Sequence, residues 1–88
     1  MSSKKDAQVI VLITGAILIA TIEEMAAAVP GEPDCKLIEP YMVTPEGTVE
    51  PWLLNITNQN EVMLSSDKIL TLVDPKTTLL AKYESVFD

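Results

Sequence analysis

The stretch AQVIVLITGAILIATIEE, residues 7–24, decides the fold of this chain. It is dense in valine, isoleucine and threonine, whose branched side chains favour extended strands over helices. Thr14-Gly15 divides the run near its middle, and glycine supplies the positive φ that a tight turn can require. The stretch therefore predicts a β-hairpin with strands over residues 7–13 and 16–24. Its apolarity is nearly continuous, which indicates that both faces of these strands are covered.

Two other interpretations compete for the same segment. Lys4 and Lys5 precede the sixteen uncharged residues 7–22, and three alanines at 26–28 follow them, an arrangement typical of a cleaved secretory signal. A membrane-spanning helix would need about 20 apolar residues. The density of β-branched residues and the interruption at Gly15 favour the hairpin over both alternatives. We therefore expect a cytoplasmic protein that does not enter a membrane.

The composition of the chain argues against several classes of function. With 88 residues, of which 48% are hydrophobic, the chain suffices for one small domain over residues 1–88 and not for a multidomain enzyme. All six basic residues are lysines against 13 acidic ones, and the net charge of −7 opposes contacts with nucleic-acid phosphates. The chain has no histidine and a single cysteine, Cys35, so the commonest general base and metal ligands are missing. We expect a non-enzymatic binding or structural module without catalytic residues, cofactor or metal.

Further strands and a terminal helix are predicted after the hairpin. Residues 26–34 are rich in alanine, proline and acidic residues, which predicts a loop. Helical spacing of apolar residues after Asp74-Pro75 predicts an amphipathic helix over about residues 75–87, with Asp74 as its N-cap. The strands are expected at residues 35–43, 48–57, 61–64 and 68–73.

The strand at residues 35–43 contains Pro40. Proline donates no backbone hydrogen bond, so Pro40 indicates a bulge or a sheet edge at this point. Simple alternation places one set of side chains on one face and a second set on the other. The first set is Leu37, Tyr41 and Val43, and the second is Ile38 and Met42.

Two segments resemble the two motifs of the Sm-like superfamily. Residues 12–22, LITGAILIATI, are similar to the first Sm motif in the spacing of Leu12, Gly15, Leu18, Ala20 and Ile22. Residues 62–72, VMLSSDKILTL, are similar to the second, in which an apolar strand, a tight turn and a final apolar strand follow one another. The chain is most similar to divergent acidic members attributed to marine phages, on the segments Ile38-Glu39-Pro40, Pro51-Trp52 and Leu79 to Tyr83.

The resemblance implies a small, strongly bent, five-stranded antiparallel barrel over about residues 7–73, closed into a homomeric ring of about five to seven subunits. Physical chemistry supports such assembly, because an unpaired edge strand is a template for another chain. A monomer whose terminal helix covers the edge is the alternative. The interface is expected at Val62, Met63, Leu64, Ile69, Leu70, Thr71, Leu72 and Val73.

Sm rings often bind single-stranded RNA, and the resemblance implies where this chain would do so. Glu39 takes the place of the asparagine of the first motif, and Ser65-Ser66 replaces the Arg-Gly pair of the second. These substitutions remove groups that stack on bases and hydrogen-bond to them. Nucleic acid is therefore disfavoured as a partner, and its candidate contacts are Glu39, Ser65, Ser66 and Lys68, with Lys4, Lys5 and Lys36 as further lysines.

An unidentified protein partner fits the acidic chain better. Trp52, beside Pro51, is a candidate aromatic anchor at an interface, with a core position as the alternative. Tyr83 and Phe87 of the terminal helix are further candidate contacts. The sequence thus predicts a structural or protein-interaction ring, in the host cytoplasm or the virion if the protein comes from a phage, with an RNA-binding ring as the alternative.

Overall fold

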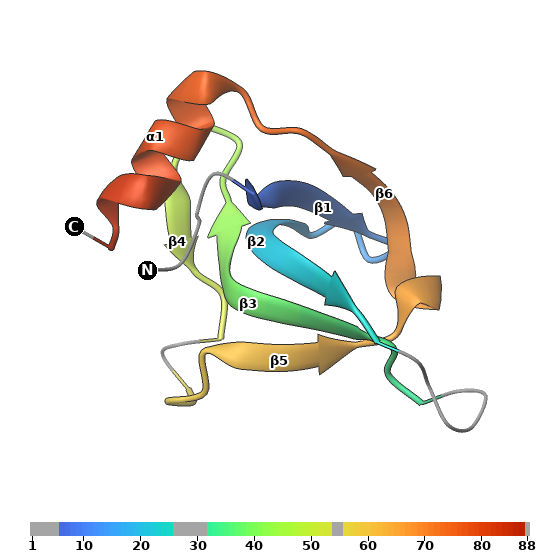
Figure 1. Ribbon diagram of the computed structural model, residues 1–88. Coiled ribbons are helices and arrows are strands. Elements are labelled where there is room, and N and C mark those ends of the chain that lie inside the picture. The colour runs from blue at the N-terminus through green and yellow to red at the C-terminus, as the bar shows by residue number, and fades with distance from the viewer. Residues whose placement is uncertain (1–5, 26–31, 54–55, 88) are drawn as a thin grey trace.

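The computed structural model describes residues 6–25, 32–53 and 56–87, which form a curled antiparallel sheet followed by a helix (Figure 1). The mostly-β fold is confirmed, although the sheet has six strands and not five. A 3-10 turn, η2 (Ser66–Lys68), joins the last two strands. The other elements are β1 (Gln8–Leu12), β2 (Ile17–Glu24), β3 (Cys35–Val43), β4 (Val49–Pro51), β5 (Glu61–Leu64), β6 (Ile69–Val73) and α1 (Thr77–Ser85).

The sheet is open. Its strands follow the order β4-β3-β2-β1-β6, with β5 beside β3. Because β2 occupies one edge of β3, β4 and β5 share the other edge, where β5 pairs with residues 35–38 and β4 with residues 41–43. Within the described residues, β6 at the far end pairs with neither β4 nor β5. Strand pairing therefore does not close the expected barrel, although the sheet curls around one face (Figure 1).

The predicted hairpin is confirmed, with Val11 opposite Ile17. Gly15 has a φ of +94°, the left-handed backbone that costs glycine least. Its amide donates a hydrogen bond to the carbonyl of Leu12 over 2.9 Å. Local sequence is enough to form this turn, since the donor and acceptor lie three positions apart.

β3 contains the bulge that Pro40 indicates. Glu39 has a φ of +54°, and the register of β3 against β2 shifts at this level. The irregularity reverses the alternation of side chains. Leu37 therefore packs inside the curl, on what we call the inner face, whereas Tyr41 packs on the outer face. The expectation that these two side chains share a face is wrong.

The strand expected at residues 48–57 is much shorter. β4 covers Val49–Pro51, and the chain bends at Trp52 and Leu53. Two causes end it: Pro51 has no amide hydrogen to donate, and β5 occupies the rest of the β3 edge. The last strand also begins one residue later than expected, because Lys68 belongs to η2.

The helix α1 begins at Thr77 and not at residue 75, and its N-cap is Lys76 and not Asp74. After β6 the chain stays extended and crosses to the outer face of the sheet before it turns into the helix (Figure 1). Tyr83 packs there with Ala7 and Ile19. The helix thus covers the face of the hairpin that the curl leaves open.

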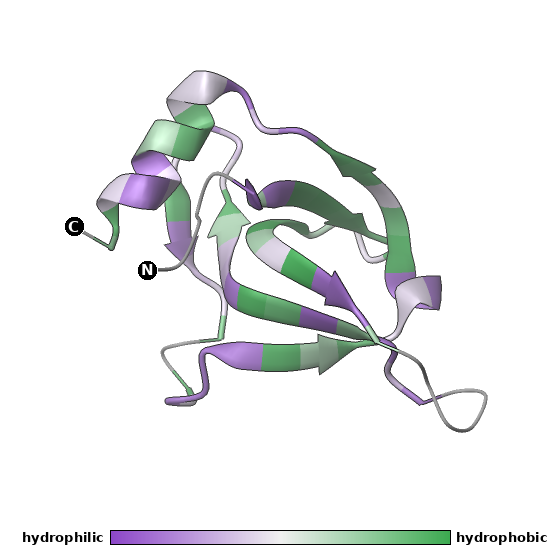
Figure 2. Ribbon diagram, viewed as in Figure 1, coloured by the Kyte–Doolittle hydropathy of each residue, from purple (hydrophilic) through white to green (hydrophobic). Residues whose placement is uncertain are grey.

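Apolar residues cover both faces of the central strands, as the unbroken apolar run predicts. Figure 2 shows hydrophobic colour along β1, β2 and β6. The second cover is the chain's own helix, and no subunit neighbour is needed for it. Inside the curl the buried residues are Ile10, Leu12, Leu18, Ala20 and Leu37, and on the outer face they are Ala7, Ile19 and Tyr83.

Candidate functional site

Three strands, β4, β5 and β6, each have one edge without a partner within the described residues. β6 pairs along one edge with β1, and β5 pairs along one edge with β3. These are the strands on which the sequence predicts an interface between copies. Their exposed apolar side chains are Met63 (44%), Leu70 (69%), Leu72 (41%) and Val73 (48%).

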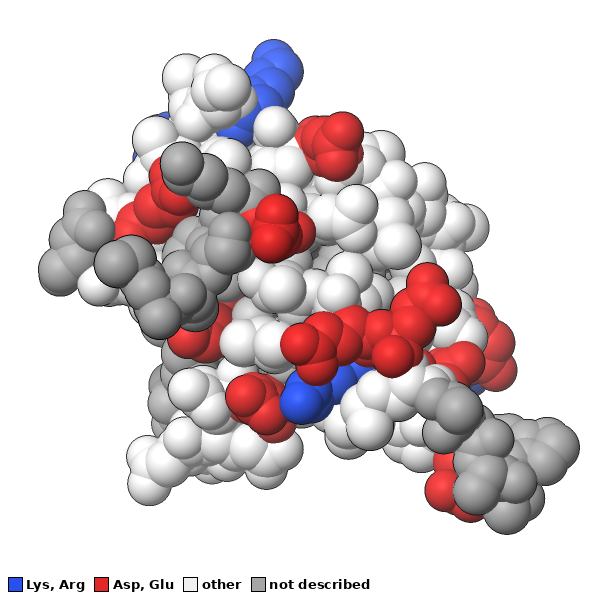
Figure 3. Space-filling model, viewed as in Figure 1, with Lys and Arg blue, Asp and Glu red and all other residues white. Residues whose placement is uncertain are grey.

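The edge of β6 has little protection against pairing. The strand contains neither a charged residue nor a proline, two devices that proteins use to keep edge strands apart. Its register against β1 shifts at Leu70, but residues 71–73 then pair regularly. Figure 3 shows an uncharged surface over β6 beside an acidic band. The free edge therefore lies in an electrically neutral part of an acidic protein.

The predicted interface residues divide between core and surface. Val62, Leu64 and Ile69 are half-buried against the inner cluster, so they hold their strands in place. Thr71 pairs with Val11 on the outer face and is exposed. The predicted residues whose side chains remain exposed to a second copy are Met63, Leu70, Thr71, Leu72 and Val73.

Asp34 anchors the corner at which β5 turns into β6. Its carboxylate accepts a hydrogen bond from the Ser66 amide at Oδ1 and another from the Ser66 hydroxyl at Oδ2, each over 2.7 Å. The hydroxyl and then the amide favour the ionised carboxylate and lower the pKa of Asp34 below its usual 3.8. The contact joins the start of β3 to η2 across 32 positions, so no local sequence pattern indicates it.

Asp34→Asn is expected to flatten the acid dependence of stability. The folded state lowers the pKa of Asp34. The stability that Asp34 contributes is therefore present above its unfolded pKa of about 3.9, and it is lost as the pH falls through its lower folded pKa. Between about pH 6 and pH 2, the melting temperature of the native chain should fall more steeply than that of the variant. Asp67→Asn, at an exposed neighbour of Ser66, is the control and should keep the native profile. Identical profiles for the native chain and Asp34→Asn would contradict this assignment.

The structure separates Glu39 from the other candidate RNA contacts. Ser65, Ser66 and Lys68 lie together at η2, where the amide of Lys68 donates to the carbonyl of Ser65. The amide of Glu39 donates to the carbonyl of Asn60, just before β5, whereas Ser65 and Ser66 follow the other end of that strand. A hollow of about 190 Å³ lies at the two serines. The other described residues of its lining are acidic, which makes the hollow unsuited to phosphate; they are Glu32, Asp34 and Asp67.

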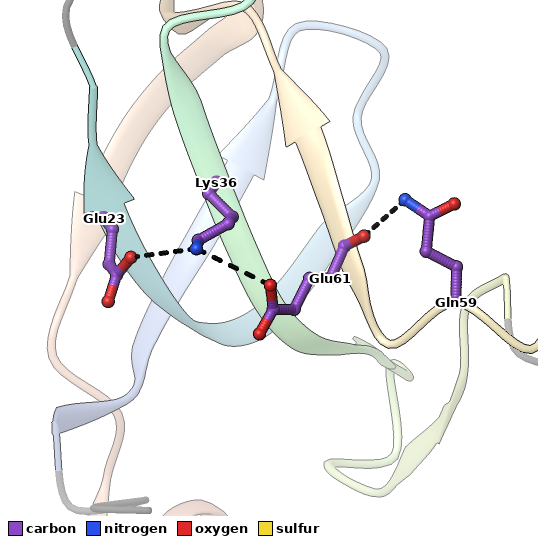
Figure 4. A network of polar contacts seen from close by, with 4 residues as sticks. All are labelled: Glu23, Lys36, Gln59 and Glu61. Atoms are coloured by element: carbon purple, nitrogen blue, oxygen red, sulfur yellow. Dashed lines mark hydrogen bonds and ion pairs between the residues drawn. The ribbon is translucent and has the colours of Figure 1, made fainter.

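Lys36 is held by two carboxylates (Figure 4). Its Nζ lies 3.4 Å from Oε1 of Glu23 and 3.5 Å from Oε1 of Glu61, which links β2, β3 and β5. The hydrogen bond with Glu23, followed by the charge of Glu61, raises the pKa of Lys36. Gln59 donates from its side-chain amide to the backbone carbonyl of Glu61. Exposed ion pairs add only about 0–1 kcal/mol to the free energy of unfolding. The main consequence is that the positive charge of Lys36 is already paired with carboxylates of the same chain.

The three candidate partner contacts differ in exposure. Tyr83 is fully buried, and its hydroxyl donates to the carbonyl of Glu39 over 2.8 Å, so the expectation of a partner contact is wrong for this residue. Burial, followed by the charge of Glu39, raises the pKa of Tyr83, which keeps the phenol neutral. Trp52 is half-buried against the inner cluster. Phe87 is 37% exposed and packs edge-to-face on Tyr83 and on Tyr41.

A cleft of about 460 Å³, which we call the β2–β6 cleft, is a feature that the sequence analysis missed. The buried Cys35 lies in its lining, and burial, then the charges of Asp34 and Glu24, raise the pKa of its thiol. The sequence contains one signal for this cleft. Side chains alternate along β2, so Glu24 falls on the same inward-facing side as Ala20 and Ile22. The described residues of its lining are Gln8, Ile22, Glu24, Met25, Asp34, Cys35, Ser66, Ile69 and Leu72.

Some sequence-level candidates lie outside the described residues. These are Lys4 and Lys5 and the alanines at 26–28. Among the residues that the structure does describe, no group of three or more His, Cys, Asp or Glu side chains could hold a metal ion. In the same part of the chain, no helix combines the length and the apolarity that a membrane crossing requires.

Comparison with known proteins gives a family and no named activity. A search of the curated proteins finds no match to this chain. The family model that matches covers residues 5–88, which include every strand and the helix. The chain therefore belongs to DUF6561, a family of unknown function.

Proposed function

We propose that the protein is a non-enzymatic assembly module that forms a homo-oligomeric, Sm-like ring. In this ring, the free edge of β5 in one copy pairs with the free edge of β6 in the next. The observation that carries the proposal is that the unpartnered edges of β5 and β6 have exposed apolar side chains, of which Leu70 is the most exposed at 69%. Such an edge is a template for a further strand.

The two edges belong to different strands, so contact between copies is heterologous. A repeated heterologous contact gives a ring if its rotation closes and a filament if it does not. In a closed ring of about five to seven subunits no edge of β5 or β6 remains exposed, and each open sheet becomes part of a continuous one. This arrangement supports the Sm-like bent barrel as the form of the assembled subunit.

Electrostatics separate this function from the alternative, an RNA-binding ring. Each copy carries a net charge of −7, while β6 carries none, so copies repel one another at long range and attract through the edge. Added salt screens repulsion beyond a Debye length of about 10 Å at 0.1 M, so assembly should strengthen. RNA binding would weaken with salt. The acidic hollow at Ser65 and Ser66 argues against RNA.

An intermolecular disulfide tests the predicted contact. Met63 and Thr71 both face outward on their strands, and in directly opposed residues of paired strands the Cβ atoms lie about 4.5–5.5 Å apart. In a Cys35→Ala background, the double variant Met63→Cys/Thr71→Cys should form a ladder of covalent oligomers on mild oxidation. The control pairs Met63→Cys with Ser85→Cys on the exposed side of α1. A ladder no longer than that of the control would contradict β5–β6 pairing.

Native mass tests the ring itself. Light scattering on the full chain should give a discrete mass of about five to seven subunits, with a larger assembled fraction at higher salt. A single species of 9.6 kDa would overturn the proposal. A further mass increase on addition of a short oligouridine, lost at high salt, would establish the RNA-binding alternative.

A further inference from the structure

The β2–β6 cleft has an apolar floor that remains partly open to solvent. Ile22 and Ile69 pack on the inner cluster and form part of the floor. Leu72 and Met25 line the cleft and keep exposures of 41% and 45%, so apolar surface is available to a ligand. The volume of about 460 Å³ falls within the range of about 300–1,000 Å³ typical of small-molecule sites.

The cleft carries negative charge. Glu24 and Asp34 line it, and none of the lining residues that the structure describes is basic. Asp34 is already engaged by Ser66. The exposed side chain of Glu24 makes no hydrogen bond or ion pair with the described residues, so it is available to a ligand. The charges of both carboxylates contribute to the raised pKa of the Cys35 thiol, which supports a negative potential within the cleft.

We infer that the β2–β6 cleft binds a small organic cation, namely a primary ammonium group on an apolar chain. The chain would lie against Met25, Ile69 and Leu72, and the ammonium would face Glu24. An anionic ligand of the same shape would be repelled, and an inorganic cation would leave the apolar floor unused. The inference does not depend on ring assembly, because one copy supplies every described residue of the lining.

Binding can be followed at Cys35, the chain's only cysteine. The probes are n-butyl-, n-hexyl- and n-octylammonium at constant ionic strength, with hexanoate and 1-hexanol as matched compounds. Calorimetry should show binding that tightens about fourfold per added methylene until the cleft is full. Hexylammonium should also slow the reaction of Cys35 with the neutral reagent methyl methanethiosulfonate, and hexanoate should not.

Variants separate charge from apolar contact. Glu24→Gln should weaken hexylammonium about threefold and leave 1-hexanol unchanged, because only the ion pair is lost. Leu72→Ala should weaken both compounds. Glu46→Gln, the same change on the exposed turn after β3, should weaken neither. N-acetyl-lysine amide distinguishes two sources of the ammonium group. If it protects Cys35 as hexylammonium does, the source is a lysine side chain. If only hexylammonium protects Cys35, the source is a free amine.

Three results would overturn the inference. The first is hexanoate binding as tightly as hexylammonium. The second is an unchanged preference for hexylammonium over 1-hexanol in Glu24→Gln. The third is no binding of octylammonium at millimolar concentration, because the apolar floor and the carboxylate would then attract nothing.

Discussion

Tyr83→Ala is expected to lower the free energy of unfolding by about 3–5 kcal/mol, a large part of the stability of so small a domain. Tyr83 is the buried residue of α1, and its ring packs on Ala7 and Ile19. The substitution empties this contact and also removes the edge-to-face packing of Tyr83 on Tyr41 and Phe87. Urea unfolding, followed by circular dichroism and tryptophan fluorescence, measures the loss.

Tyr83→Phe is the matched control. It keeps the ring and removes only the hydroxyl that donates to the carbonyl of Glu39, at the bulge of β3. The expected cost is about 0.5–1.5 kcal/mol, because one buried hydrogen bond is lost. Equal midpoints for the alanine and phenylalanine variants would show that α1 does not unfold cooperatively with the sheet, contrary to the packing described above.

Leu70→Lys combined with Val73→Lys is expected to reduce the assembled protein to a single 9.6 kDa species. Both side chains are exposed on β6, at 69% and 48%, so the fold of one copy loses little packing. In the proposed ring, the two lysines would bury charge between strands, and lysine is a residue with which proteins keep edges unpaired. Light scattering gives the mass, and circular dichroism verifies that the strands remain.

Ile56→Lys is the control for this experiment. Ile56 is 77% exposed and precedes β5, outside both edge strands. It makes the same apolar-to-lysine change, and the assembly should be kept. If Ile56→Lys dissociates the protein as completely as the β6 variant, then assembly depends on the overall charge of the chain and not on the β6 edge. An unchanged mass for the β6 variant would remove the edge from the interface.

The sequence by itself determined the elements whose cause is local. The hairpin forms because β-branched runs flank Gly15, and the bulge of β3 follows from Pro40. The strand at Glu61–Leu64 matches its predicted bounds, since apolar residues stand between polar clusters. Five of the eight side chains at which the sequence predicts an interface are exposed in the structure, and the interface itself stays a prediction.

Only the tertiary structure decided which distant residues meet. β4 is short because β5 pairs with the same edge of β3. The contact of Asp34 with Ser66 spans 32 positions. The β2–β6 cleft needs four strands to converge. The physical reason is common to these three cases. Segments far apart in the sequence meet and compete for the same surface, and the local sequence of one segment does not indicate which others it will meet.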